Sequence, residues 1–223
     1  MALQQRLDSG LAPLLDRDRF AFPAGSVVAV VGPPRAPTDA VLAHAAAARE
    51  TLYFTTKRDP EWVAETVAAS TDGGLGICVE RVCHARQKEA VRVHRTDDEV
   101  AYERPTRPAT GTTQSRSEDR FESLRATLQQ RSDIPPGIVI DDFTDYADGT
   151  RRCLDLLETV REATEALAWL HVVHPTDDPS HAEAVITAAD TVCTIDGEDG
   201  DVRLKVPRRR GDSPIITPQP MSF

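Results

Sequence analysis

Short apolar runs alternate with amphipathic stretches along this chain. Residues 27–31 are a continuous apolar run, mostly β-branched, which is typical of a strand buried on both faces of a parallel sheet. Residues 38–50 follow with helix-forming residues and apolar side chains at helical spacing. A strand, a tight turn and a helix in this order predict the start of a βαβ unit.

The same alternation continues toward the C-terminus. We predict further strands over 51–56, 75–79, 90–93, 138–142 and 167–174, and helices over 60–70, 118–131, 153–166 and 180–188. Asp59 suits the N-cap of the second helix, and Pro60 suits its first position. Residues 191–195 and 202–206 predict a C-terminal β-hairpin. The pattern predicts an α/β domain with a largely parallel central sheet flanked by helices, whose ligands bind at the carboxyl ends of the strands.

The chain has 223 residues, which favours one domain, over residues 1–212. Residues 96–119 are polar, contain Pro105 and Pro108 and show no periodicity, so we predict a mobile loop there. Residues 213–223 are predicted to be a tail.

The composition is acidic and poor in lysine. There are 36 acidic and 26 basic residues, for a net charge of −10, which excludes a whole-chain polyanion binder. Only Lys57, Lys88 and Lys205 are lysines. This composition resembles that of cytosolic proteins from salt-loving archaea, although a GC-rich genome that favours Arg and Ala codons also explains it.

No apolar run approaches the roughly 18 residues of a membrane helix, and the first ten residues lack signal-peptide features, so we expect a cytoplasmic protein without membrane contact. The four cysteines form no Cys-x-x-Cys pair and are expected to be free, buried thiols.

The turn after the first predicted strand occupies the place of a phosphate-binding loop. A P-loop of pattern G-x-x-x-x-G-K-S/T cradles phosphates with backbone N–H groups, a lysine and a magnesium-binding hydroxyl. Here the segment reads Gly32-Pro33-Pro34-Arg35-Ala36-Pro37-Thr38-Asp39. Pro37 stands for the second glycine, Thr38 for the lysine and Asp39 for the hydroxyl, so only Gly32 fits.

Several ordered segments resemble the RecA superfamily, in particular its KaiC-like and RadA-like archaeal branch. They are the lead into the first strand (residues 9–15 and 23–27), the phosphate-loop position, the second strand and turn (52–61), the Ile-Val-Ile-Asp-Asp strand (138–142) and two closing strands (189–192 and 204–211). The resemblance covers residues 9–215 and implies a RecA-like P-loop NTPase fold.

The resemblance also implies a nucleotide site, whose positions this chain has largely altered. Its candidate ATP-binding residues are Gly32, Pro33, Pro34, Arg35, Thr38, Asp39, Asp141 and Asp142. Asp141 takes the place of the aspartate that holds magnesium if nucleotide binds. Lys57 and Arg58 occupy the family's catalytic glutamate position, where a cation cannot act as a general base. Glu61, a turn later, is a poor substitute, so we expect no catalytic residue and a pseudo-ATPase without a required cofactor.

Two arginine-rich segments and a histidine pair are the remaining candidates. Arg208, Arg209 and Arg210 could contact a polyanion or a neighbouring subunit, but a solvated charge run explains them as well. The same holds for a second basic cluster, which lacks interleaved aromatic residues: Arg81, His84, Arg86, Lys88, Arg92 and Arg95. His171 and His174 lie three residues apart on one predicted strand and therefore on opposite faces, which argues against joint metal binding.

Three functions stay open at this point. The first is a catalytically degenerate domain that acts as a regulatory or protein-interaction module, pairing with an active paralogue or another protein, or with itself. The second is residual ATP binding or slow hydrolysis, with Arg35 or Lys57 supplying the missing positive charge. The third is a DNA-associated accessory protein that uses the arginine clusters.

Overall fold

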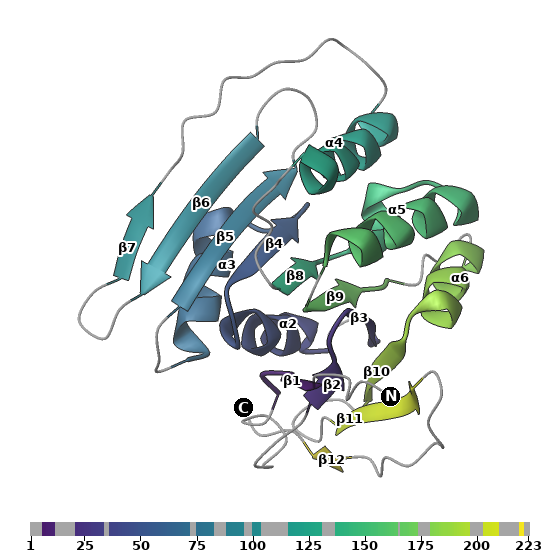
Figure 1. The fold of residues 1–223 in the computed structure, drawn as a ribbon, viewed down its shortest axis with the longest axis horizontal. Coiled ribbons are helices and arrows are strands. Elements are labelled where there is room, and N and C mark those ends of the chain that lie inside the picture. The colour runs from purple at the N-terminus through teal and green to yellow at the C-terminus, as the bar shows by residue number, and fades with distance from the viewer. Residues whose placement is uncertain are drawn as a thin grey trace.

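The computed structural model describes residues 6–11, 21–33, 36–71, 75–82, 88–95, 100–103, 116–130, 137–164, 166–173, 179–196, 203–209 and 219–220. A ten-stranded sheet runs through the middle of the molecule, in the order β12-β11-β10-β3-β9-β8-β4-β5-β6-β7 (Figure 1). A separate two-stranded antiparallel sheet pairs β1 (Arg6–Asp8) with β2 (Ala21–Pro23).

The six strands at the centre of the large sheet are parallel. They are β10 (Thr191–Asp196), β3 (Ser26–Val31), β9 (Leu167–His171), β8 (Gly137–Ile140), β4 (Thr51–Thr55) and β5 (Leu75–Val82). Antiparallel strands extend the sheet at both ends: β6 (Lys88–Arg95) and β7 (Val100–Glu103) beyond β5, and β11 (Arg203–Arg209) and β12 (Gln219–Pro220) beyond β10. The predicted α/β class, parallel sheet and C-terminal hairpin are confirmed.

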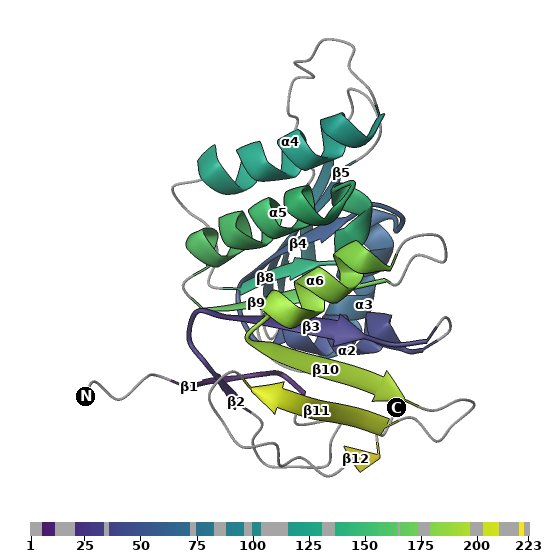
Figure 2. The same ribbon diagram turned by 90° about the vertical axis from the view of Figure 1, so that its right-hand side faces the viewer.

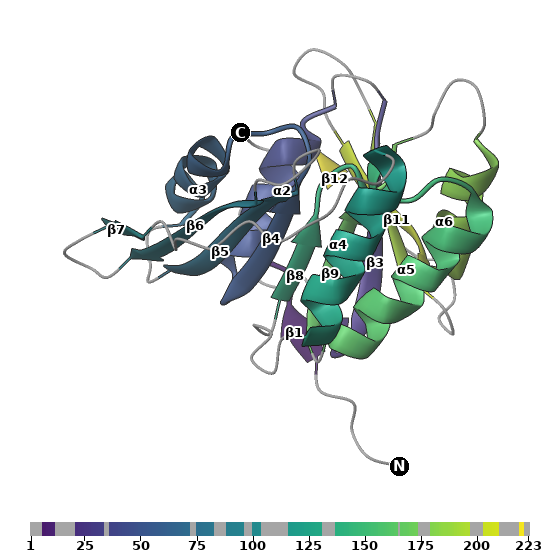
Figure 3. The ribbon, with the colours of Figure 1, turned by 90° about the horizontal axis from the view of Figure 1, so that it is seen from above.

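Helices cover both faces of the sheet (Figures 2 and 3). On one face lie α2 (Thr38–Ala47) and α3 (Pro60–Ala69), and on the other lie α4 (Arg116–Gln130), α5 (Thr150–Ala163) and α6 (Ser180–Ala188). Asp59 caps α3 and Pro60 is its first residue, as the sequence predicts.

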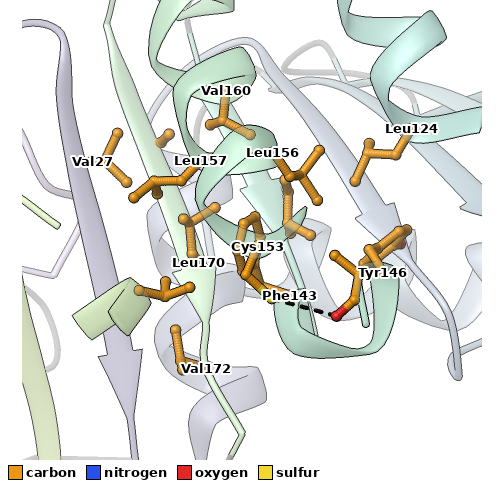
Figure 4. Close-up of a cluster of buried hydrophobic side chains, with 14 of the residues drawn as sticks. Val27, Leu124, Phe143, Tyr146, Cys153, Leu156, Leu157, Val160, Leu170 and Val172 are labelled. Carbon is orange, nitrogen blue, oxygen red and sulfur yellow. Dashed lines mark hydrogen bonds between the residues drawn. The ribbon is translucent and has the colours of Figure 1, made fainter. Parts of the chain in front are cut away.

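Each face buries its own hydrophobic cluster. Because β3 is covered on both faces, the side chains of Val27 to Val30 are fully buried and alternate between the two clusters. On the α2–α3 face, Phe22 packs edge-on against Trp169 at 5.5 Å between ring centroids. Figure 4 shows the other cluster, where Leu157 of α5 packs with Val27 and Leu170.

Two predicted irregular segments contain regular structure. The loop prediction for 96–119 is wrong where β7 pairs with β6 and where α4 begins at Arg116. The Val-Ala-Tyr-Glu sequence of β7 is short, but strand-forming side chains and backbone pairing with a long neighbour are enough to order it. The predicted tail likewise includes β12, which pairs with β11. The other residues of both segments lie outside the described part of the chain.

The remaining differences concern the ends of elements and the cysteines. β8 ends at Ile140, so Asp141 and Asp142 follow the strand instead of closing it, and α5 begins three residues earlier than predicted. Cys153 and Cys193 are buried, as expected, whereas Cys78 is only partly buried, and none of these three forms a disulfide with another described residue. Cys83 is outside the described residues. None of the described helices combines the length and apolarity that crossing a membrane requires.

Candidate functional site

The carboxyl ends of four neighbouring parallel strands bring the candidate residues to one edge of the sheet. β3 leads into Gly32, β4 into Lys57 and Arg58, β8 into Asp141 and Asp142, and β9 ends on His171. The first turns of α2 and α3 begin at the same edge because each helix directly follows one of these strands.

The loop between β3 and α2 satisfies its own backbone groups. The Ala36 N–H donates to the carbonyl oxygen of Pro33 at 2.9 Å, and the Thr38 N–H donates to that of Ala36 at 2.8 Å. Pro33 and Pro37 have no N–H group. Pro37 is the N-cap of α2 and provides no side-chain cap. Among the described residues of this loop, Pro33 and Pro37 thus have no N–H group, and Ala36 and Thr38 already donate theirs to backbone carbonyl oxygens.

Ala36 also packs directly over Gly32. A Cβ atom placed on Gly32 would come within 2.7 Å of the Ala36 Cβ and 3.3 Å of the Ile195 Cβ. Ala36 and Ile195 can therefore pack this closely only because residue 32 is a glycine. Pro34 and Arg35 lie outside the described residues.

An ion pair joins the first turn of α2 to the turn after β4. The Arg58 guanidinium lies 2.5 Å from the Asp39 carboxylate. The backbone N–H of Arg58 donates to the Thr55 hydroxyl at 3.0 Å, and this hydrogen bond fixes the backbone of the turn. The same guanidinium lies over the indole ring of Trp62, 5.0 Å from its centroid.

Lys57 forms a second set of ion pairs, with two carboxylates in the segment that follows β8. Its ammonium lies 2.9 Å from Asp142 and 3.2 Å from Asp145, a residue of the short 3₁₀ helix Phe143–Tyr146. Burial lowers the pKa of Lys57, but the hydrogen bonds and charges of these two carboxylates outweigh it and raise the pKa above its ordinary value. Lys57 is therefore a fixed cation.

Asp141 is turned toward β4 and is almost fully buried. Its carboxylate accepts the Thr56 N–H at 3.2 Å and a hydrogen bond from the Thr55 side chain. Burial raises the pKa of Asp141 to about 7, with a further contribution from the neighbouring Asp142, and the hydrogen bonds from Thr55 and Thr56 only partly oppose it. Asp141 therefore holds a proton more tightly than an ordinary aspartate does.

Asp142 has the opposite electrostatic character. Its backbone is left-handed, with φ 46°. Its carboxylate forms the ion pair with Lys57 and lies 3.3 Å from the Nδ1 atom of His171. Burial would raise the pKa of Asp142, but hydrogen bonds to His171 and Lys57 lower it to about 2. The pKa values of two adjacent carboxyl groups are thus shifted in opposite directions, one group facing inward to β4 and the other paired with Lys57 and in contact with His171.

The structure assembles part of the predicted site and adds to it. Gly32, Asp39, Lys57, Arg58, Asp141 and Asp142 meet at this edge. His171 and Asp145 also belong to the cluster, and sequence reasoning missed that role. For His171 the available signal was its place at the end of the strand next to β8. Among the residues that the structure describes, no group of three or more His, Cys, Asp or Glu side chains could hold a metal ion.

The arginine-rich candidates lie elsewhere or outside the described part. Arg208 and Arg209 are on β11, and β10, β3 and β9 lie between that strand and β8. Arg210, His84, Arg86 and His174 are outside the described residues. The backbones of Arg81, Lys88, Arg92 and Arg95 lie on the antiparallel β5–β6 pair.

Comparisons with known proteins agree with this architecture. Residues 6–77 match a family described as a family of unknown function, DUF7125. No curated protein matches the chain. A crystal structure of a KaiC-like protein from the hyperthermophilic archaeon Pyrococcus horikoshii is similar over 98% of this chain and 94% of that one, with a TM-score of 0.60 and 12% identity. The chain therefore has the RecA-like α/β fold of a KaiC-like protein.

Proposed function

We propose that this protein is a catalytically inactive RecA/KaiC-like domain that works as a regulatory, protein-binding module. One observation carries the proposal: Asp39, at the family's magnesium-hydroxyl position, forms an ion pair with Arg58, which with Lys57 occupies the family's catalytic-glutamate position. A site that neutralises its own charges in this way has little left with which to bind a charged ligand.

The phosphate loop supports the same conclusion. Phosphates bind a P-loop through free N–H groups at a helix N-terminus, where the helix dipole also attracts anions. At α2 the prolines lack N–H groups, and Ala36 and Thr38 donate theirs to backbone carbonyls. Asp39, in the first turn of α2, adds a negative charge where a phosphate would approach. These features of the described residues support a site that does not bind a nucleoside triphosphate.

The metal and base positions point the same way. Magnesium prefers ionised oxygen ligands, whereas Asp141 is buried, accepts the backbone N–H of Thr56 just after β4, and has a pKa raised by burial. Lys57 and Arg58 can stabilise negative charge but cannot accept a proton from water. Hydrolysis would lack both its base and its metal partner.

Thermal unfolding with and without magnesium ATP tests this proposal. A ligand that binds only the folded state at a hundredfold excess over its Kd adds about 2.7 kcal/mol of stability. The acidic, lysine-poor composition makes potassium chloride brine the appropriate solvent. We expect the same Tm with millimolar magnesium ATP as with magnesium alone, and no phosphate release.

The control is the Asp141→Ala variant. An ATP-dependent rise in Tm that this variant abolishes would contradict the proposal. It would instead establish the second candidate, a residual ATP-binding site in which Asp141 keeps the family's role at the end of β8.

A further inference from the structure

One exposed aromatic side chain stands beside the candidate site. Trp62, on α3, is 43% exposed, and it is the one large hydrophobic side chain that is exposed among the residues the structure describes. With Lys57, Arg58, Asp59 and Glu65, which are also exposed, it forms what we call the α3 surface. This surface is continuous with the site because Arg58 contacts both Trp62 and Asp39.

Trp62 is held in place although it is exposed. The Arg58 guanidinium covers one side of the ring at 5.0 Å and is itself anchored by Asp39. The Asp59 side chain accepts the Glu61 N–H at 2.9 Å and the Trp62 N–H at 3.4 Å, so the backbone that carries the indole is also fixed. A rigid tryptophan loses little conformational entropy on binding, and tryptophan and arginine are the residues most enriched in binding hot spots.

The charge around Trp62 selects the kind of partner. Lys57 is already paired with Asp142 and Asp145, and Arg58 with Asp39. Asp59 and Glu65 form no ion pair with another described residue, so these two carboxylates give the exposed face negative charge. A nucleic acid or an acidic peptide would be repelled, whereas guanidinium groups could pair with these carboxylates and stack on the indole.

We propose that the α3 surface docks an arginine-rich segment of a partner protein, with Trp62 as the central apolar anchor. The proposal rests on the proposed function, since it names the chemistry of the partner that an inactive domain would bind. Stacking on Trp62 and fork-shaped pairing with carboxylates both require guanidinium groups, so a lysine segment of equal charge binds more weakly.

An arginine nonapeptide is a suitable probe, with a lysine nonapeptide as its charge-matched control. Both are labelled and titrated by fluorescence anisotropy at the lowest potassium chloride concentration that keeps the protein folded. We expect Trp62→Ala to raise the Kd for the arginine peptide about tenfold, the size of a moderate hot spot. Glu65→Gln should raise the same Kd about twofold to threefold, as for an exposed ion pair.

The matched control is Glu162→Gln, which removes the same charge from an exposed position of α5 on the opposite face of the sheet. It should leave the Kd unchanged. Trp62→Phe keeps an aromatic ring and should retain part of the affinity. It also leaves buried Trp169 as the remaining tryptophan, so the quenching of tryptophan fluorescence that we expect from peptide binding to wild type should disappear. Equal Kd values for wild type and Trp62→Ala, or equal losses in Glu65→Gln and Glu162→Gln, would overturn the proposal.

Parallel titration with magnesium ATP separates this inference from the proposed function. Peptide binding that depends on Trp62 together with ATP binding would refute the inactive-domain proposal and leave the docking surface. Absence of both would refute the docking surface and leave the inactive domain.

Discussion

The guanidinium of Arg58 and the carboxylate of Asp39 lie 2.5 Å apart, across the gap between β4 and α2. By the resemblance to the RecA family, Arg58 and Lys57 occupy the position of a catalytic glutamate, and Asp39 that of a magnesium-binding hydroxyl. Either substitution alone would leave an uncompensated charge at the end of the sheet. Under the proposed function, this contact within the protein stands where other members of the family would contact a bound ligand.

This pair should show measurable coupling. In a double-mutant cycle with Arg58→Ala and Asp39→Ala, we expect a coupling free energy of about 0.5–1 kcal/mol, because both side chains are partly exposed and solvent screens them. Denaturant unfolding measures the free energy of each variant. A coupling of zero would show that the two charges do not support each other. The exposed pair Arg161 and Glu158 on α5 provides a comparison.

The Gly32→Ala variant should lose about 1–3 kcal/mol of stability, since the added methyl group must displace Ala36 or the neighbouring backbone. Chemical denaturation measures the loss. Gly76→Ala is the matched control: its Cβ would lie 3.4 Å from the Glu50 side chain, an ordinary contact, so we expect no loss there. Equal effects at both glycines would mean that the loop after β3 is not closely packed.

Replacing Lys57 by methionine should raise the pKa of Asp142 from about 2. A depressed carboxyl pKa adds stability above the ordinary value near 4, and this stability is lost as the pH falls toward 2. As the pH falls over that range, the variant should therefore lose less stability than wild type does. At neutral pH the substitution itself should cost about 1 kcal/mol or less, because Lys57 is more than half exposed. NMR titration of the Asp142 carboxyl measures the pKa. Lys57→Arg, which keeps the charge, should leave it low.

Asp141 predicts the opposite dependence on pH. Its raised pKa means that the folded state binds the proton more tightly than the unfolded state, so stability increases as the pH falls from about 7 to about 4. Asp141→Asn stays neutral and can still accept the Thr56 N–H. Its stability relative to wild type should therefore grow from pH 5 to pH 8, up to a few kcal/mol at about 1.4 kcal/mol per pKa unit. A difference independent of pH would show that Asp141 is ionised throughout.

The buried hydroxyl of Tyr146 has no hydrogen-bond partner among the residues that the structure describes, so Tyr146→Phe should be at least as stable as wild type. The Thr144 hydroxyl, two residues earlier, donates to the Val173 carbonyl oxygen at 3.1 Å. Thr144→Val should consequently lose about 1 kcal/mol. Thermal unfolding of the two variants distinguishes them, and a destabilised Tyr146→Phe would reveal a partner for the phenol.

The alternation of strands and helices could be predicted because each element carries its own periodicity. Val27 to Val31 and Ile138 to Ile140 are apolar on both faces, and Asp59 with Pro60 marks a helix start in the local sequence. Strand ends also located the candidate site, because parallel strands place their carboxyl ends at one edge.

Pairings between distant residues could not be predicted in the same way. β7 and β12 are ordered by neighbours in the sheet and not by their own patterns. Arg58 and Asp39 were each recognised as substitutions, but their contact depends on how α2 lies against the turn after β4. His171 was considered only as a metal ligand with His174, and its contact with Asp142 follows from the register of β8 with β9.

The outermost strands of the ten-stranded sheet have a bearing on solubility. β7 has four residues and β12 has two, one of which is Pro220, which cannot donate a backbone hydrogen bond. Edge strands this short offer few free backbone groups to a strand from another molecule. Although the sheet is wide, its two outermost strands are therefore poor templates for β-pairing with another molecule.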